Sequence, residues 1–313
     1  MSLAFVFPGQ GSQSVGMLAE LASAFAEVGQ TFEQASEALG YDLWQVVSDG
    51  PAEQLNKTHV TQPAMLAAGV ATWRIWQANN GPAPAVMAGH SLGEYTALVC
   101  AGAIAFEDAV GLVADRGRFM QEAVPAGEGA MAAILGLDDQ AVIEVCEKAA
   151  GGEVVSAVNF NAPGQVVVAG SAGAVARAVE LAKEAGAKRA VTLPVSAPSH
   201  CALMQPAADQ LAQRLAGVEI GVPSIPVLHN ADVDAKDSPD AIRDALVRQL
   251  HSPVRWVETI KAMAGQGVDA LVECGPGKVL AGLNKRIERR MPAYPLLDRA
   301  SLDKALSELA KEQ

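Results

Sequence analysis

A serine between two glycines, in the segment Gly89-His90-Ser91-Leu92-Gly93, is the first group of this chain whose surroundings suggest chemistry. An apolar run ends at Gly89, and a helix-forming segment follows Ser91. This strand, G-x-S-x-G, helix order exposes a nucleophilic serine on a tight turn. We expect glycines here because a Cβ would clash, and the helix would direct free N–H groups towards an anion beside Ser91. The alternative is an ordinary turn whose serine caps a helix.

A serine hydroxyl is a weak nucleophile and needs a neighbouring base. The candidates are His59, His90, His200, His229 and His251. The side chain of His90 should diverge from its neighbour on such a turn, His59 is expected in a polar loop, and His229 is expected within a strand. His200 follows a strand and a Pro198 turn and is expected to begin a helix, which places it at the carboxyl edge of a sheet, where open α/β sheets build their sites. Position favours His200 over His251 only modestly, and a histidine satisfied by local backbone stays the alternative.

Two arginines of a helix expected over 106–123 face different ways. Arg118 has Asp115 and Glu122 within one turn, which indicates an ordinary surface ion pair of small energy. Arg116 lies on a stripe that is otherwise apolar, and a buried cation is costly unless it is paired. Its partner is either a distant carboxylate of this chain or an anionic substrate, since a guanidinium can make two parallel bonds to a carboxylate.

The composition limits what kind of protein can carry these groups. Half of the 313 residues are apolar and 19% are charged, which is typical of a globular enzyme-like chain. The net charge of −12 argues against nucleic acid as a general partner. No apolar run reaches the ~18 residues of a membrane span. The start of the chain shows no export signal, and four cysteines without CxxC spacing indicate reduced thiols without a metal site, so we expect a cytoplasmic protein.

Strand-like and helix-like segments alternate along most of the chain, which is typical of a mainly parallel sheet covered on both faces. A short strand is expected from residue 3 until it stops at Pro8-Gly9, further strands are expected at 83–89, 225–231 and 269–277, and an amphipathic helix is expected at 62–80. The order changes in the middle, where strands at 129–137, 153–160, 165–171 and 187–195 flank two helices in a βαββαβ order. We therefore expect a discontinuous large α/β domain, 1–125 and 197–313, with an inserted ferredoxin-like small domain, 126–196.

Five segments stand in an order that resembles one enzyme family: FVFPGQGSQ, GHSLGEYTALVCAG, the ADRG around Arg116, PSH at 198–200, and ECGPGKVL. Together they resemble the malonyl-CoA:acyl carrier protein transacylases of bacterial type II fatty acid synthesis and, more distantly, the acyltransferase domains of polyketide synthases. The resemblance covers nearly the whole chain. It implies an α/β-hydrolase-like large domain interrupted by a ferredoxin-like one.

The resemblance also implies roles for individual residues. Ser91 would carry the acyl group, His200 would be its base, and Arg116 would hold the free malonyl carboxylate. The backbone carbonyl of Gln249 would orient His200 where other enzymes use a carboxylate. The remaining implied site residues are Gln10 and the Leu92 N–H for the oxyanion hole, and Asn159 facing the cleft. No metal and no permanently bound cofactor are implied, because the coenzyme A thioester is the substrate.

An acidic carrier protein would have to meet a local basic patch on this acidic chain. The candidates are Lys285, Arg286, Arg289 and Arg290, expected within about two helical turns, together with Lys188 and Arg189. A solvated helix face is the alternative.

Two other functions remain in competition. A serine thioesterase would share the elbow and the histidine, but it would use water as acceptor and would not need a buried Arg116. A phosphate-binding module could use PGQGSQ or GPGK, but neither matches G-x-x-x-x-G-K-[ST], since Val279 stands where the hydroxyl is required.

Overall fold

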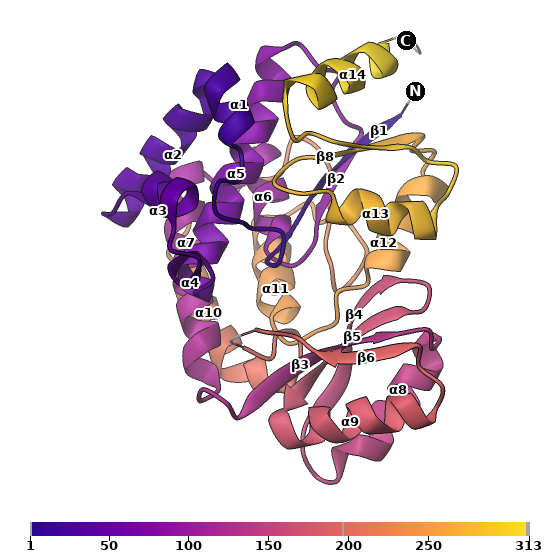
Figure 1. The fold of residues 1–313 in the computed structure, drawn as a ribbon. Coiled ribbons are helices and arrows are strands. Elements are labelled where there is room, and N and C mark those ends of the chain that lie inside the picture. Colours follow the sequence, from indigo (N-terminus) through magenta and orange to yellow (C-terminus); the bar gives the residue numbers. More distant parts are fainter. Residues whose placement is uncertain (1, 196, 311–313) are drawn as a thin grey trace.

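A computed structural model describes residues 2–195 and 197–310, and it contains a parallel sheet and a separate antiparallel sheet (Figure 1). The strand order of the parallel sheet is β7-β2-β1-β8-β9. The bounds are β1 Leu3–Phe7, β2 Val86–Gly89, β7 Val227–Leu228, β8 Ala270–Glu273 and β9 Ala293–Pro295. Neighbouring strands pair in parallel throughout, so their carboxyl ends meet at one edge of the sheet.

Helices cover both faces of this sheet, because alternate residues of each strand point to opposite sides. In β1, Phe5 and Phe7 enter a core shared with the α5 side, whereas Ala4 and Val6 enter a core shared with α12 and α13. The helices on the first side are α1 Ala19–Ala24, α2 Ala26–Leu39, α3 Leu43–Asp49, α4 Ala52–Leu55, α5 Thr58–Ala78, α6 Gly93–Cys100, α7 Phe106–Ala123 and α10 Gln205–Leu215. Helices α11 Pro239–Gln249 and α14 Arg299–Ala310 also pack into this first core, whereas α12 Trp256–Gly265 and α13 Val279–Ile287 cover the other face.

The antiparallel sheet has the strand order β4-β5-β3-β6. Its elements follow one another as β3 Gly129–Leu135, α8 Asp139–Ala150, β4 Val155–Ala162, β5 Gln165–Ser171, α9 Ala172–Glu184 and β6 Arg189–Thr192. Both helices pack on one face, where they share a hydrophobic core with the strands. The other face, with Met131 and Val158, packs against Cys201 and therefore lies beside the His200 turn.

The antiparallel sheet makes main-chain hydrogen bonds with the loop before α12 near the end of β4. Phe160 N–H donates to Val254 O at 3.0 Å, and Val254 N–H donates to Val158 O at 2.8 Å. A register shift between Ala157 and Asn159 interrupts the β4–β5 ladder at this point. The irregular stretch of β4 therefore faces the loop before α12.

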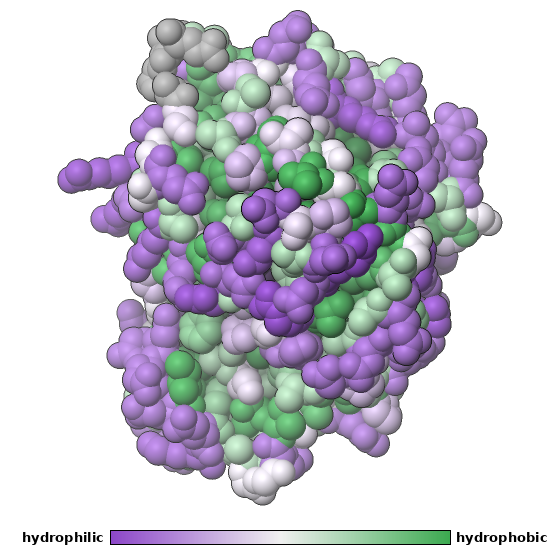
Figure 2. All heavy atoms as spheres, turned by 180° about the vertical axis from the view of Figure 1, so that it is seen from behind, coloured by the Kyte–Doolittle hydropathy of each residue, from purple (hydrophilic) through white to green (hydrophobic). Residues whose placement is uncertain are grey.

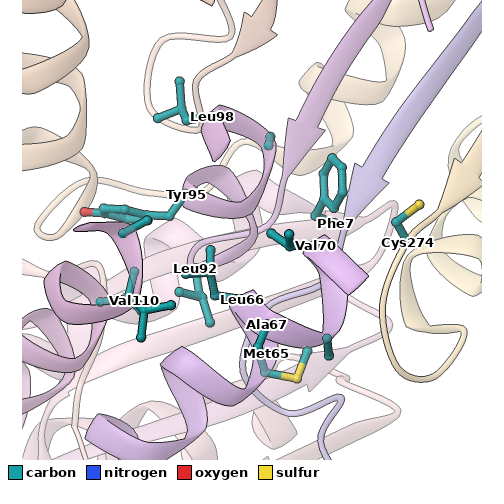
Figure 3. Close-up of a cluster of buried hydrophobic side chains, with 14 of the residues drawn as sticks. Phe7, Met65, Leu66, Ala67, Val70, Leu92, Tyr95, Leu98, Val110 and Cys274 are labelled. Carbon is teal, nitrogen blue, oxygen red and sulfur yellow. The ribbon is translucent and has the colours of Figure 1, made fainter. Parts of the chain in front are cut away.

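The helix expected at 62–80 is α5, but the prediction that it is amphipathic was wrong. It is buried on nearly every side, because it runs between α2, α6, α7 and β1. Figure 3 shows Met65, Leu66 and Val70 of α5 beside Phe7 and Leu92. His59, expected in a loop, lies in the first turn of this helix.

Several further elements differ from the sequence-based expectation. His229 follows β7 and is not within it, and α3, α4, β9 and α14 were not anticipated. The surface opposite to the view of Figure 1 is mostly polar, with apolar residues in separate patches (Figure 2). In the described part of the chain, no helix combines the length and apolar character that a membrane span requires.

Candidate active site

The turn between β2 and α6 places Ser91 at the carboxyl edge of the parallel sheet. Ser91 has φ 52°, a left-handed conformation that is costly for a residue with a Cβ. A Cβ on Gly89 would lie 1.8 Å from the carbonyl carbon of Gly93, and a Cβ on Gly93 would lie 2.0 Å from Phe7 O. The prediction that both glycines are required by steric crowding is therefore confirmed.

His200 is the histidine that the fold brings to Ser91. Its Nε2 lies 2.8 Å from Ser91 Oγ, and its Nδ1 lies 2.8 Å from Gln249 O. The Nδ1–H therefore donates to the carbonyl, which leaves Nε2 free to accept the hydroxyl proton. His200 does not begin a helix as expected, because it has φ 67° and its own N–H donates to Leu250 O. A short 3₁₀ turn, Ala202–Met204, and then α10 follow it.

The end of α11 takes the place of a carboxylate behind His200. Gln249 is the last residue of α11, so its carbonyl is among the four that lack a partner within the helix. This helix end also carries partial negative charge, which stabilises a nearby imidazolium. Burial and the positive charge of Arg116 lower the pKa of His200 to about 3, so the resting imidazole is neutral and can act as a base.

Arg116 reaches the same point from α7, and its side chain is 1% exposed. Its Nη2 donates to Ser91 Oγ at 3.3 Å and to Gln249 Oε1 at 3.0 Å, and its Nη1 donates to Gln62 Oε1 at 2.9 Å. Within residues 2–195 and 197–310, no carboxylate forms an ion pair with it. The positive charge of the guanidinium is therefore not offset by a direct carboxylate contact among these residues.

Arg118 differs from Arg116 in the way that the sequence predicts. It is exposed and lies 3.0 Å from Asp115 and 3.6 Å from Glu122, so it belongs to a surface ion pair. Burial of Arg116 and exposure of Arg118 follow from their positions on one helix.

The pocket around Ser91 has a volume of about 120 Å³ and contains every residue expected at the chemical step except Gln249, which lies behind it. This volume accommodates a short acyl group. Its lining includes Gln10, Leu92, Arg116, Asn159 and His200. The Oδ1 atom of Asn159 is buried and has no hydrogen-bond partner among the described residues, which leaves it free to accept a bond from a ligand.

Sequence reasoning missed several polar residues of this site. Gln62 and Asn230 are buried and hold Arg116 and Ser91, and His90 pairs with Asn161 at 2.8 Å instead of with Ser91. Glu94 is fully buried on α6. A carboxylate within an apolar helix is the same signal that identified Arg116, and it was available at Glu94.

The predicted basic residues are all exposed, and among them Lys285 and Arg286 lie on a helix. α13 ends at Ile287, so Arg289 and Arg290 follow it. Arg286 donates to Pro163 O at 3.0 Å and to the side chain of Gln165, in the turn between β4 and β5. Gly164 O in turn accepts from Gly136 N–H, and Gly136 packs against Lys188. The turn therefore contacts Arg286 directly and approaches Lys188 through Gly136.

The GPGK segment does not form a phosphate site. Glu273 occupies the N-terminus of α13, where its carboxylate accepts from the N–H groups of Leu280 and Ala281 at 3.0 and 2.8 Å. A carboxyl group of the chain itself is therefore already in the place that a phosphate would take, and burial raises its pKa to about 7. Among the described residues, no cluster of His, Cys, Asp and Glu suited to a metal ion was found.

The parallel sheet, the glycine-flanked serine and its histidine together define a class, the enzymes that act on acyl groups through a serine. A family model described as an acyl transferase domain matches residues 4–297, and the chain belongs to this family.

Curated and solved relatives extend the comparison over nearly the whole chain. The malonyl CoA-acyl carrier protein transacylase of Escherichia coli strain K12 is 61% identical over 303 residues, which cover 97% of this chain and 98% of the relative. An acyl carrier protein S-malonyltransferase from Vibrio cholerae is 62% identical, covers 97% of this chain and 99% of that chain, and superposes with a TM-score of 0.95. A malonyl-transacylase solved in complex with a type II polyketide synthase acyl carrier protein is 58% identical, with 98% and 100% covered and a TM-score of 0.97.

Proposed function

We propose that this chain transfers the malonyl group of malonyl-CoA to the phosphopantetheine thiol of acyl carrier protein, in fatty acid biosynthesis. The relatives named above carry this activity in their names, and one was solved with a carrier protein. The single observation that carries the proposal is Arg116, a buried cation that forms no ion pair with any carboxylate among the described residues and lies 3.3 Å from a nucleophilic hydroxyl. A malonyl unit has a thioester carbon for Ser91 and a free carboxylate for the guanidinium.

The first half-reaction forms a malonyl-serine ester. His200 Nε2 accepts the Ser91 proton as Oγ attacks the thioester carbon, and the tetrahedral oxyanion lies towards Gln10 and the Leu92 N–H at the start of α6. The carbon–sulfur bond breaks, and the proton passes from His200 to the leaving thiolate of coenzyme A. The long Arg116–Ser91 bond is the one that the malonyl carboxylate would replace.

The second half-reaction runs in the opposite sense. The carrier thiol gives its proton to His200 and attacks the ester, and Ser91 recovers the proton as the new thioester leaves. A carbonyl behind His200 supports the imidazolium less than a carboxylate would. This is sufficient for a thioester substrate, whose thiolate is a good leaving group, and one thioester replaces another so the reaction runs both ways.

The finer architecture is also part of the proposal. We assign an α/β-hydrolase-like large domain to 1–125 and 197–313 and a ferredoxin-like small domain to 126–196; residue 1, residue 196 and residues 311–313 lie outside the described residues. The βαββαβ order and the separate core of the antiparallel sheet support this division. The catalytic pocket then lies between the domains, because Asn159 and Met131 of the small sheet line it together with Ser91.

Carrier protein would dock on the surface formed by the two basic groups, on either side of the Pro163–Gly164 turn. The candidates are Lys188, Arg189, Lys285, Arg286, Arg289 and Arg290, all exposed. This surface offers local positive charge on a chain of net charge −12, which an acidic partner requires. The free cysteines suit a reducing compartment, and a cytoplasmic location stays a prediction.

Intact mass spectrometry after mixing with malonyl-CoA tests the proposal. The parent chain should gain the mass of one malonyl group and lose it when carrier protein is added, while Ser91→Ala gains none. A malonyl adduct on Ser91→Ala would refute the serine as carrier. Release of malonate at the same rate with and without carrier protein would instead identify a thioesterase.

A further inference from the structure

Two buried side chains beneath the elbow, Glu94 and His229, take part in none of the steps above. Glu94 lies in the first turn of α6 and is fully buried, and His229 follows β7 and is 1% exposed. His229 Nδ1 lies 2.7 Å from Glu94 Oε1. The Nε2 atom of His229 has no hydrogen-bond partner among the described residues, so the hydrogen bond of this ring is the one that Nδ1–H donates to Glu94.

The second oxygen of Glu94 holds the two residues that fix the main chain of Ser91. Oε2 accepts from Asn230 N–H at 2.8 Å and from Gln249 Nε2 at 3.0 Å. The side chain of Asn230 then accepts from Ser91 N–H at 2.7 Å and donates to Gly89 O at 2.7 Å. Gln249 Nε2 also donates to Ser91 O at 2.9 Å. Both main-chain polar groups of the strained serine are therefore held by residues that share one carboxylate.

The carboxylate of Glu94 is connected to Arg116 through a single side chain, that of Gln249. Gln249 Oε1 accepts from the guanidinium, while its Nε2 donates to Glu94, so one amide separates a buried cation from a buried anion. In a low-dielectric interior, the negative charge of Glu94 stabilises the positive charge of Arg116 even across one amide. A carboxylate in direct contact would compete with a substrate carboxylate for the guanidinium, and the amide prevents that contact.

Gln249 also connects Glu94 to the base. Its backbone carbonyl accepts from His200 Nδ1, and its side chain is held at three points, by Glu94, Ser91 O and Arg116. A shift of this residue would therefore move the carbonyl that orients His200. Because Ser91 and His200 must stay within 2.8 Å of each other, small displacements should be costly.

We infer that Glu94 is a positioning residue for the transfer. Its carboxylate fixes the positions of the Ser91 main chain and of Gln249, and its negative charge partly offsets the positive charge of Arg116 across one amide. The inference rests on the proposed function. Three donors converge on this carboxylate, from His229, Asn230 and Gln249. An amide in its place would present an N–H₂ to one of these donors, so Glu94→Gln keeps the volume and breaks the network.

Glu94→Gln should lower kcat for malonyl transfer about 10²-fold, the cost of a small misplacement of reacting groups. The KM for malonyl-CoA should not rise, because Arg116 is retained and is less balanced by negative charge. Glu273→Gln is the matched control: it removes another buried carboxylate that accepts two backbone N–H bonds, and it lies outside the network. It should lower the unfolding temperature and leave kcat per folded molecule unchanged.

A fluorophosphonate that labels Ser91 gives a second readout, which does not depend on the identity of the acyl substrate. Labelling should slow in Glu94→Gln and not in Glu273→Gln. A parent chain that labels normally but transfers no malonyl group would contradict the proposed function, and slower labelling of Glu94→Gln would then still show that Glu94 positions Ser91, though not for this transfer. Should Glu94→Gln not fold, Glu94→Asp keeps the charge one methylene short of its partners and should show the same loss of kcat. Parent-like kcat and labelling in a folded Glu94 variant, or an equal loss in Glu273→Gln, would overturn the inference.

Discussion

Replacing Arg116 by alanine should change which acyl group the enzyme prefers more than it changes the serine chemistry. The guanidinium is buried, has no carboxylate partner in the described part of the chain, and lies beside Ser91 Oγ. A malonyl group offers it a carboxylate, whereas an acetyl group of the same thioester offers only a methyl group. The ratio of malonyl to acetyl transfer therefore isolates this contact.

The geometry of Arg116 gives the expected size of the effect. A carboxylate in the place of the Ser91 contact would accept up to two charge-assisted bonds, each worth about 1.5–3 kcal/mol. At about 1.4 kcal/mol for each factor of ten, loss of both should lower the malonyl-to-acetyl ratio of kcat/KM by about 10²–10⁴-fold. Arg116→Lys keeps the charge without the planar fork and should fall between the parent and Arg116→Ala.

Transfer from malonyl-CoA and from acetyl-CoA to carrier protein, measured side by side for the parent and both variants, gives the ratio directly. Arg116→Ala also loses its bonds to Gln62 and Gln249, so acetyl transfer is expected to fall as well. The ratio cancels that shared loss. Equal reductions for the two substrates would refute the assignment of Arg116 to the malonyl carboxylate.

Three further predictions concern the elbow, the docking surface and the base. Gly93→Ala should destabilise the chain by about 1–3 kcal/mol in urea unfolding and abolish transfer, because the new Cβ would clash with Phe7 O. Gly29→Ala in α2, where a Cβ meets open space, should stabilise the chain slightly. Equal effects of the two substitutions on stability would contradict the steric argument. Lys285→Glu should raise the KM for carrier protein at low salt and spare that for malonyl-CoA, and Lys304→Glu on α14, which changes net charge equally, should do neither. The pKa of His200 lies near 3 in the folded chain and its ordinary value is 6.5, so kcat/KM should stay constant well below pH 6.5. The free energy of unfolding should fall as the pH drops from 6.5 towards 3, because the unfolded chain takes up the proton first. A decrease of kcat/KM with an apparent pKa of 6.5, or the same pH dependence of stability in His200→Gln, would contradict this.

Much of the fold could be predicted because alternation and turn residues are local signals. The βαββαβ order of the middle segment is visible in the sequence and matches the structure element by element. The amphipathic prediction for α5 failed because burial on all sides depends on neighbours from distant segments. The strand β9 was missed because its three half-buried residues carry little periodicity. Helix α14 was overlooked although Leu302, Ala305 and Leu309 recur at helical spacing.

Residues of the candidate site were predictable where a residue type was unusual for its neighbours in the sequence. Ser91 stands between glycines that crowding demands, and Arg116 stands on an apolar stripe. The choice between His200 and His251 was not fixed by local pattern, because it depends on how α11 approaches the β6–α10 connection. Asn230 and Gln62 carry no local signal, since a buried amide becomes informative only when its partners are known.

The left-handed backbone at both Ser91 and His200 has a cost for the molecule as a whole. Each such conformation stores about 1–3 kcal/mol in a residue that has a side chain, and the rest of the structure must outweigh it. Glycine at either place would relax the backbone and remove the reacting group. Substitution by glycine at either position would therefore raise the thermal stability of the chain and abolish its activity.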